Sequence, residues 1–187
     1  TIGAEISLWN PLLLNWLGTL RQDCPDLAVR TEVRERQTLH EQLQHGVLDA
    51  ALVHQPDYWP GMQVEQLLEE KLVLVQSIIS AEPYIFVDWG ESFRRQHDTA
   101  LPQYVRATLN LNLGPLALYY ILEHGGSGYF RTRVVQRYVR EGSLQRVSQS
   151  PEFTYPIYLV YNRGKLQGAL QRAVQSLRRA IAKEEDW

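Results

Sequence analysis

Cysteine is almost missing from this sequence, since Cys24 is the single one among 187 residues. One cysteine cannot form an intramolecular disulfide, so the chain lacks the framework that stabilises many small secreted domains. We therefore expect a protein of the reducing cytoplasm. The five histidines do not fall at metal-ligand spacings with acidic or sulfur partners either, so we expect no metal and no cofactor.

Long apolar runs and an excess of basic residues are also missing. No segment approaches the roughly 18 apolar residues that a membrane span needs. Lys and Arg number 19 against 21 Asp and Glu, a formal net charge of −2, whereas chains that neutralise many phosphates are usually basic. We expect neither membrane association nor direct DNA binding by this chain.

The beginning of the chain lacks two further features. Thr1 is neither an initiating methionine nor the start of a visible signal peptide, and a strand pattern already occupies Ile2–Leu8. We expect this chain to be a fragment of a longer protein.

Apolar residues alternate between a spacing of two and spacings of three to four, which predicts alternating strands and helices. Pro11, Gly46 and Pro115 lie where helices begin or end. The pattern predicts helices at Leu12–Leu20, Thr38–His45, Glu91–Gln96, Pro115–Glu123, Val134–Val139 and Leu166–Ala182. It predicts strands at Ile2–Leu8, Leu27–Val33, Leu48–Val53, Val64–Leu68, Lys71–Gln76, Tyr84–Val87, Tyr104–Leu109, around Tyr129 and at Ile157–Tyr161.

Such alternation is typical of an α/β protein whose mostly parallel sheets are covered by helices on both faces. The runs Lys71–Gln76 and Ile157–Tyr161 would cross between two lobes, which we place at 1–75 with 162–187 and at 76–161. Ligands of such folds bind outside the carboxyl ends of the strands. A cleft between the lobes is therefore the expected site.

The segment Gly125-Gly126-Ser127-Gly128 superficially resembles a phosphate-binding loop. It lacks the Gly-Lys-Ser/Thr ending of a P-loop and the spacing of a dinucleotide fingerprint. Its glycines fit better with a positive-φ turn, a close approach of two backbones, or a ligand held by free amide donors.

His54 follows the apolar strand Leu48–Val53 and so stands at an end where ligand contacts are expected. As a general base it would need an orienting partner and an adjacent nucleophile, and no sequence motif supplies them. We expect His54 to line a pocket, with a surface loop as the alternative. Because no catalytic constellation emerges elsewhere, we expect no enzyme.

Several segments, in chain order, resemble LysR-type transcriptional regulators. Leu39 to Leu52 resembles the family's helix-to-strand motif, with Gly46, Leu48, Asp49 and Ala50 in place. Cys24-Pro25-Asp26-Leu27 is similar to its Pro-Asp turn, Gly126-Ser127-Gly128-Tyr129-Phe130 to its Gly-x-Gly element, Glu141-Gly142-Ser143-Leu144 to its Gly-x-Leu turn, and Pro156–Tyr161 to its returning crossover strand.

One residue departs from the family pattern, and two segments resemble one subgroup of the family in particular. Arg131 stands where the family commonly has proline, which affects the expected loop geometry and pocket charge. Ile2-Gly3-Ala4 and Val87-Asp88-Trp89-Gly90 further resemble a subgroup that includes a repressor of flagellar genes.

The resemblance implies a periplasmic-binding-protein-like fold, with two α/β lobes joined by two crossover strands and a small-molecule effector in the cleft. It also implies homodimers or higher homo-oligomers that reposition an N-terminal winged helix-turn-helix, which nothing in this chain matches. By carry-over, the effector pocket would be lined by Ser7, Leu8, Trp9, Asn10, Arg36, Gln37, Thr38, His54 and Gln55, and from the second lobe by Trp89, Asn112, Ser127, Gly128 and Tyr129. Thr38 could instead be a helix N-cap, and Trp89 a core residue.

Three questions stay open from the sequence. A solute-binding protein of a transporter shares the expected fold and is the alternative function. Arg36 and the glycine-turn amides favour an anionic effector, whereas Trp9, Trp89 and Tyr129 favour an aromatic or apolar one. Self-association is expected because two helices offer more apolar surface than one lobe needs to bury, through Leu13, Trp16, Leu17, Leu20, Val134, Val135 and Tyr138.

Overall fold

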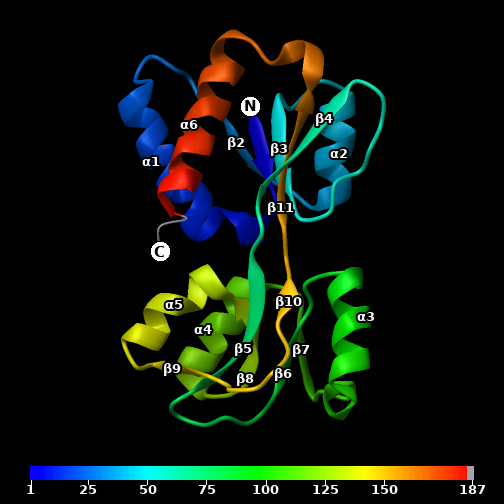
Figure 1. Cartoon of the computed structure of the whole chain (residues 1–187), viewed down its shortest axis with the longest axis vertical. Coiled ribbons are helices and arrows are strands. Elements are labelled where there is room, and N and C mark those ends of the chain that lie inside the picture. The colour runs from blue at the N-terminus through cyan, green and yellow to red at the C-terminus, as the bar shows by residue number, and fades with distance from the viewer. Residues whose placement is uncertain (185–187) are drawn as a thin grey trace. The chain divides into compact units, whose positions relative to one another are not determined.

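The structure, a computed structural model, describes residues 1–184. The chain forms two compact units, Thr1–Glu69 with Pro156–Trp187 and Glu70–Tyr155 (Figure 1). The last residues of the predicted first lobe, 185–187, lie outside the described part.

The first unit is built on a five-stranded sheet in the order β2-β1-β3-β11-β4. The first three strands run parallel, and β11 runs antiparallel to both β3 and β4. The unit contains β1 (Ile2–Ala4), η1 (Ile6–Leu8), η2 (Trp9–Leu13), α1 (Leu14–Asp23), β2 (Thr31–Val33), α2 (Arg36–Gln44), β3 (Ala50–Val53), β4 (Met62–Leu68), β11 (Ile157–Asn162), η4 (Arg163–Lys165) and α6 (Gly168–Glu184).

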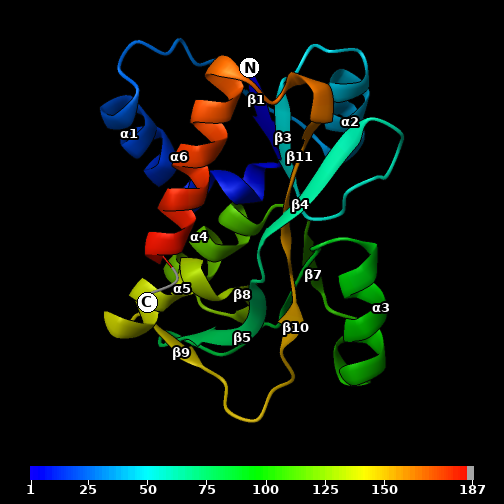
Figure 2. The same ribbon diagram turned by 45° about the horizontal axis from the view of Figure 1, so that its top comes forward.

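Two cores cover the faces of this sheet, because successive strand residues point to opposite sides. Ala50 and Leu52 of β3 join the core with α1 and α6, whereas Ala51 and Val53 join the core with α2. Figure 2 shows α1 and α6 on one side of the sheet and α2 on the other. A Cβ added at Gly3 would lie 2.4 Å from Leu39 Cδ2, so α2 packs directly against the β1 backbone.

The second unit is centred on β5, which runs antiparallel to β8, β9 and β10. β6 and β7 form a separate parallel pair. The unit contains β5 (Lys71–Ser77), β6 (Ile85–Val87), α3 (Glu91–Ala100), η3 (Pro102–Tyr104), β7 (Leu109–Leu111), α4 (Gly114–His124), β8 (Ser127–Arg131), α5 (Thr132–Arg140), β9 (Leu144–Arg146) and β10 (Phe153–Thr154).

Arg131 forms a buried ion pair with Glu70 at the first residue of the second unit. Its Nε and Nη2 lie 2.7 and 2.6 Å from Glu70 Oε2, and both side chains are 1% exposed. The other carboxylate oxygen accepts from the Arg133 N–H in the first turn of α5, at 3.3 Å. Arg131 has φ −61°, the angle that proline also adopts, so the backbone here does not depart from what proline allows.

The pairing corrects three expectations about strands. Mostly parallel sheets were expected in both lobes, yet β8, β9 and β10 all run antiparallel to β5, because an apolar run does not encode strand direction. The strand expected at Tyr104–Leu109 is η3 followed by β7, since Pro102 favours a helical turn. β5 pairs only within the second unit and β11 only within the first, so the crossings lie at Glu69/Glu70 and Tyr155/Pro156.

The apolar helix surface expected for self-association is largely buried inside the chain. Leu13, Trp16 and Leu20 are fully buried in the core that also contains α6, and Val135 is buried in the second unit. The reason is that α6 covers the apolar stripe of α1. Leu14 and Val139 remain exposed on α1 and α5 instead.

Candidate functional site

Two polar side chains follow β1 and one follows β3, at the same edge of the first unit. Glu5 comes directly after β1, Ser7 lies in η1, and His54 comes directly after β3. β1 and β3 are neighbouring parallel strands, so their carboxyl ends meet at one edge, where ligands of α/β sheets bind. We call Glu5, Ser7 and His54 the strand-end cluster.

His54 is the centre of this cluster, and it is 5% exposed. Its backbone N–H donates to Glu5 Oε2 at 2.7 Å. Nδ1 lies 3.0 Å from the Pro156 carbonyl oxygen, and Nε2 lies 3.1 Å from Ser7 Oγ. Because a carbonyl only accepts, Nδ1 donates to Pro156, and Nε2 shares the second hydrogen bond with the Ser7 hydroxyl.

Glu5 is held in an environment that opposes its charge. Burial raises the pKa of the Glu5 carboxyl, and this outweighs the lowering by the His54 N–H and by the nearby charge of Arg36. The carboxylate is half-buried, with one oxygen committed to His54. A carboxylate in this position can accept a hydrogen bond from a donor group of a ligand.

The start of α2 carries the second polar group of this unit. Arg36 Nη1 lies 3.1 Å from Asp57 Oδ1, and His40 Nδ1 lies 2.6 Å from Asp57 Oδ2. The Asp57 N–H donates to His40 Nε2 at 3.4 Å. Burial lowers the pKa of His40, although Asp57 acts in the opposite direction. His40 therefore fastens the loop after β3 to α2.

Thr38 is not the N-cap of this helix. The N-cap is Glu35, which makes no side-chain cap hydrogen bond, and Thr38 is the third residue of α2. The alternative role as a helix cap is therefore wrong, because the helix begins two residues before Thr38.

The remaining residues predicted for the first lobe differ in accessibility. Leu8 is fully buried, and the half-buried Trp9 packs against the same core. Asn10 is exposed, as is Gln37, which donates to Glu41 at 3.1 Å, and Gln55 is half-buried.

Two aromatic residues predicted for the pocket lie in the core of the second unit. Trp89 is 9% exposed and donates its Nε1–H to the Tyr129 carbonyl oxygen at 2.8 Å. Tyr129 is fully buried, and its hydroxyl donates to the Pro151 carbonyl oxygen at 3.0 Å. Asn112 is exposed after β7, whereas Ser127 and Gly128 are buried in β8.

The glycine turn before β8 uses its amides within the chain. Gly125 and Gly126 have φ values of 86° and 124°, as a positive-φ turn requires. Their N–H groups donate to the Ile121 and Ser80 carbonyl oxygens, and the Ser127 N–H donates to Pro83. The expectation of free amide donors here is wrong for these three groups, since neighbouring carbonyls accept from them.

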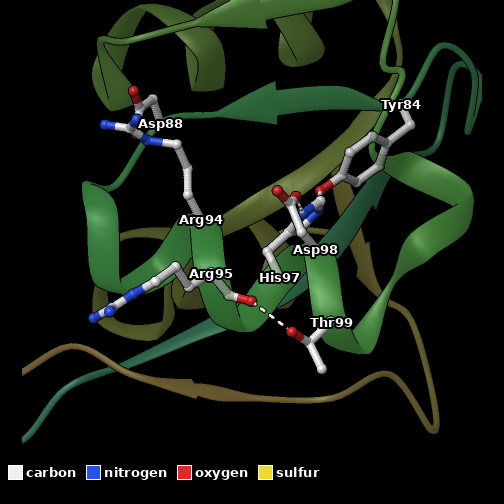
Figure 3. Close-up of polar contacts among 7 residues, drawn as sticks. All are labelled: Tyr84, Asp88, Arg94, Arg95, His97, Asp98 and Thr99. Carbon is white, nitrogen blue, oxygen red and sulfur yellow. Dashed lines mark hydrogen bonds and ion pairs between the residues drawn. The ribbon is translucent and has the colours of Figure 1, made fainter.

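A second polar cluster surrounds His97 of α3 in the second unit (Figure 3). His97 is fully buried, with Nε2 2.7 Å from the Tyr84 hydroxyl and Nδ1 3.1 Å from Asp98 Oδ1. Burial raises the pKa of Tyr84 well above its ordinary value. At the other end of α3, Arg94 donates to Asp88 at 3.0 Å. The cluster is closed by aromatic rings, so its visible role is to hold α3 in place.

The sequence pattern missed Glu5, His40 and Asp57. An acidic residue within the strand pattern Ile2–Leu8 was the signal that could have found Glu5. Across residues 1–184, no three or more His, Cys, Asp or Glu side chains are grouped to hold a metal ion. Over the same residues, no helix has the length and apolarity needed to cross a membrane.

Solved structures with the same arrangement define the class of fold. A reduced form of OxyR from N. meningitidis matches with a TM-score of 0.74 and 17% identity, covering 98% of this chain and 94% of that chain. The C-terminal domains of a LysR family protein from Agrobacterium tumefaciens str. C58 match with a TM-score of 0.77 and 15% identity, covering 97% and 95%. The predicted two-lobed, periplasmic-binding-protein-like fold is confirmed.

The sequence itself gives the family. Residues 1–182 match the LysR substrate binding domain, so the chain belongs to that family. The HTH-type transcriptional regulator HdfR of Yersinia pestis (strain Pestoides F) is 24% identical over 188 residues, which cover 92% of this chain. The chain spans 63% of the length of that relative.

These matches confirm the resemblance to LysR-type regulators, and HdfR is among the relatives to which the chain is similar. The chain is the effector-binding domain of a LysR-type regulator. The transporter alternative is not favoured, because the matched relatives are transcriptional regulators.

Proposed function

We propose that this domain binds its small-molecule effector at the strand-end cluster, Glu5, Ser7 and His54. The observation that carries the proposal is the buried His54, whose backbone N–H and both ring nitrogens are hydrogen-bonded at the carboxyl ends of two parallel strands. A site built this way is held rigidly before a ligand arrives, which lowers the entropy cost of binding.

In the second unit, we propose Asn112 and Ser127 as polar contacts of the effector. Asn112 is exposed at the end of β7, and Ser127 begins β8 beside the glycine turn. Trp89 and Tyr129 then serve as the packed layer that supports β8 rather than as direct ligand contacts, because both are buried.

The full-length protein has further proposed properties. We propose that it acts in the cytoplasm as a homodimer or higher homo-oligomer, and that it binds DNA through an N-terminal helix-turn-helix outside this chain. HdfR, described as an HTH-type regulator and longer than the matched region, supports this. No catalytic step is required for such signalling, so the proposed protein is a sensor and not an enzyme.

A thermal-shift screen of metabolites tests the ligand site. A metabolite that binds the folded domain at 100 times its Kd stabilises it by roughly 2.7 kcal/mol, which raises the melting temperature. Ser7→Ala is expected to reduce that rise. Ser92→Ala is the control, since Ser92 Oγ accepts from Gln96 in an exposed pair on α3, in the second unit. An effector that stabilises Ser7→Ala as strongly as the parent would show that the site is elsewhere.

A further inference from the structure

The loop between β3 and β4, residues 55–61, is fastened to α2 through one buried side chain. His40 of α2 contacts Asp57 of this loop at two atoms. Its Nδ1 lies 2.6 Å from Asp57 Oδ2, and its Nε2 accepts from the Asp57 N–H at 3.4 Å. Trp59, two residues further along, packs edge-on against the imidazole, with the ring centroids 5.3 Å apart. The loop therefore encloses the imidazole that holds it.

The hydrogen bond from the Asp57 N–H requires a neutral imidazole. A backbone N–H can only donate, so Nε2 must accept through its lone pair. A protonated imidazole carries hydrogen on both ring nitrogens and has no acceptor left. Protonation of His40 therefore replaces this hydrogen bond by a contact between two donors, while the attraction to the Asp57 carboxylate remains.

Two charges of opposite sign act on the His40 ring. Asp57 favours its protonation, whereas Arg36, whose Nη1 lies 3.1 Å from Asp57 Oδ1, opposes it. Burial has the largest effect and lowers the pKa of His40 from its ordinary value of 6.5. The contact made by the neutral ring is thus fully present above pH 6.5, and it is lost as the pH falls through the lowered pKa of the folded state.

We infer that His40 is a pH-sensitive latch on residues 55–61: the neutral imidazole fastens the loop to α2, and protonation releases the loop. The loop begins directly after His54, at the carboxyl end of β3, so the latch acts at the edge of the sheet that carries the strand-end cluster. The inference goes beyond the proposed function and does not depend on it, because every contact that it uses joins α2 to the loop.

A pH titration of the isotope-labelled domain, followed by NMR from about pH 8 to about pH 5, covers the range in which histidine changes its charge. The ring resonances of His40 and the amide resonance of Asp57 are expected to shift with one common midpoint. Below it, protection of the Asp57 amide against hydrogen exchange is expected to fall about two- to tenfold relative to the intrinsic rate at the same pH, as for the loss of one hydrogen bond. Amide relaxation of Tyr58 is expected to report greater motion of the loop.

Three variants assign this transition. His40→Gln removes the titrating ring and is expected to abolish the transition of the Asp57 amide; it keeps Glu5 and His54, so a transition that survives belongs to another group. His45→Gln, at the exposed end of α2, is the matched control and is expected to keep the transition. Asp57→Asn keeps the N–H and removes the charge that raises the pKa of His40, so it is expected to move the midpoint to lower pH.

Each outcome decides for or against the latch. A common midpoint that disappears in His40→Gln, persists in His45→Gln and moves to lower pH in Asp57→Asn establishes it. The latch is refuted if the Asp57 amide is unaffected while the His40 ring titrates, if the ring does not titrate in this range, or if the transition survives in His40→Gln. If His40→Gln does not fold, Asp57→Asn decides alone, and an unchanged midpoint then refutes the latch.

Discussion

Glu5 shows how one side chain couples folding to pH. Burial raises the pKa of its carboxyl, so the folded state favours the protonated form more than the unfolded state does. The stability that Glu5 contributes is therefore fully present below its ordinary pKa of 4.5 and is lost as the pH rises through the raised, folded value.

Glu5→Gln is expected to gain stability relative to the parent as the pH rises from about 4 to about 7, because glutamine imitates the protonated form at every pH. Urea unfolding at several pH values measures this difference. Glu35→Gln, at an exposed position, is expected to show a flat difference. A flat difference for Glu5→Gln as well would mean that burial does not control this carboxyl.

Sequence patterns located His54, and the family resemblance named Ser7, but neither revealed that His54 contacts Ser7 and Pro156. The position of His54 after an apolar strand follows from local spacing, whereas Ser7 and Pro156 lie 47 and 102 positions away in the chain. The fold creates the hydrogen bonds that join His54 to Ser7 and to Pro156. Thr38 was placed on the correct helix, but the start of the helix was misjudged by two residues.

At the scale of elements, the packing of α4 requires glycine at position 114. A Cβ at Gly114 would lie 2.3 Å from Trp89 Cη2, so the start of α4 packs directly on the indole ring. Gly114→Ala is expected to destabilise the protein by about 1–3 kcal/mol, because Trp89 is buried and has no room to move.

Gly18→Ala is the matched control for that change. Gly18 lies within α1, and an added Cβ would meet nothing within 4 Å. The exposed helical site is expected to gain about 0.5–1 kcal/mol, since alanine loses less backbone entropy than glycine. Chemical denaturation of both variants gives the comparison. Equal effects of the same sign would refute the close packing on Trp89.

The order of helices and strands was largely predictable, whereas their partners were not. Apolar spacing identified α6 and its stripe, including Val174, Leu177 and Ile181, which are buried in the structure. It could not reveal that this stripe covers Leu13 and Trp16 of α1. The direction of β5 relative to its partners, and the residues at which the chain passes between the two units, could not be predicted either. Pairing between strands that are distant in the sequence produces no local pattern of apolar residues.

At the scale of the whole molecule, the two units differ in how the chain builds them. The second unit is one continuous stretch, Glu70–Tyr155, with its own hydrophobic core and the buried Glu70–Arg131 pair. The first unit needs two separate stretches, because β11 lies between β3 and β4.

Residues 70–155 expressed alone are therefore expected to fold, with dispersed NMR resonances and one cooperative thermal transition. Residues 1–69 alone are expected to remain unfolded, since the sheet then lacks its inner strand β11 and the core lacks α6. Failure of 70–155 to fold, or independent folding of 1–69, would contradict this description.

The inner position of β11 also sets an order of events on the ribosome. During synthesis from the N-terminus, β3 and β4 leave the ribosome before β11. The edge of each strand that pairs with β11 therefore stays unpaired until Ile157–Asn162 has been synthesised. The second unit, Glu70–Tyr155, is synthesised in between, so it can fold before β11 pairs with β3 and β4. His54 receives its Pro156 contact at the same stage, so a nascent chain completes the hydrogen bonds of the strand-end cluster only after the start of β11 has been synthesised.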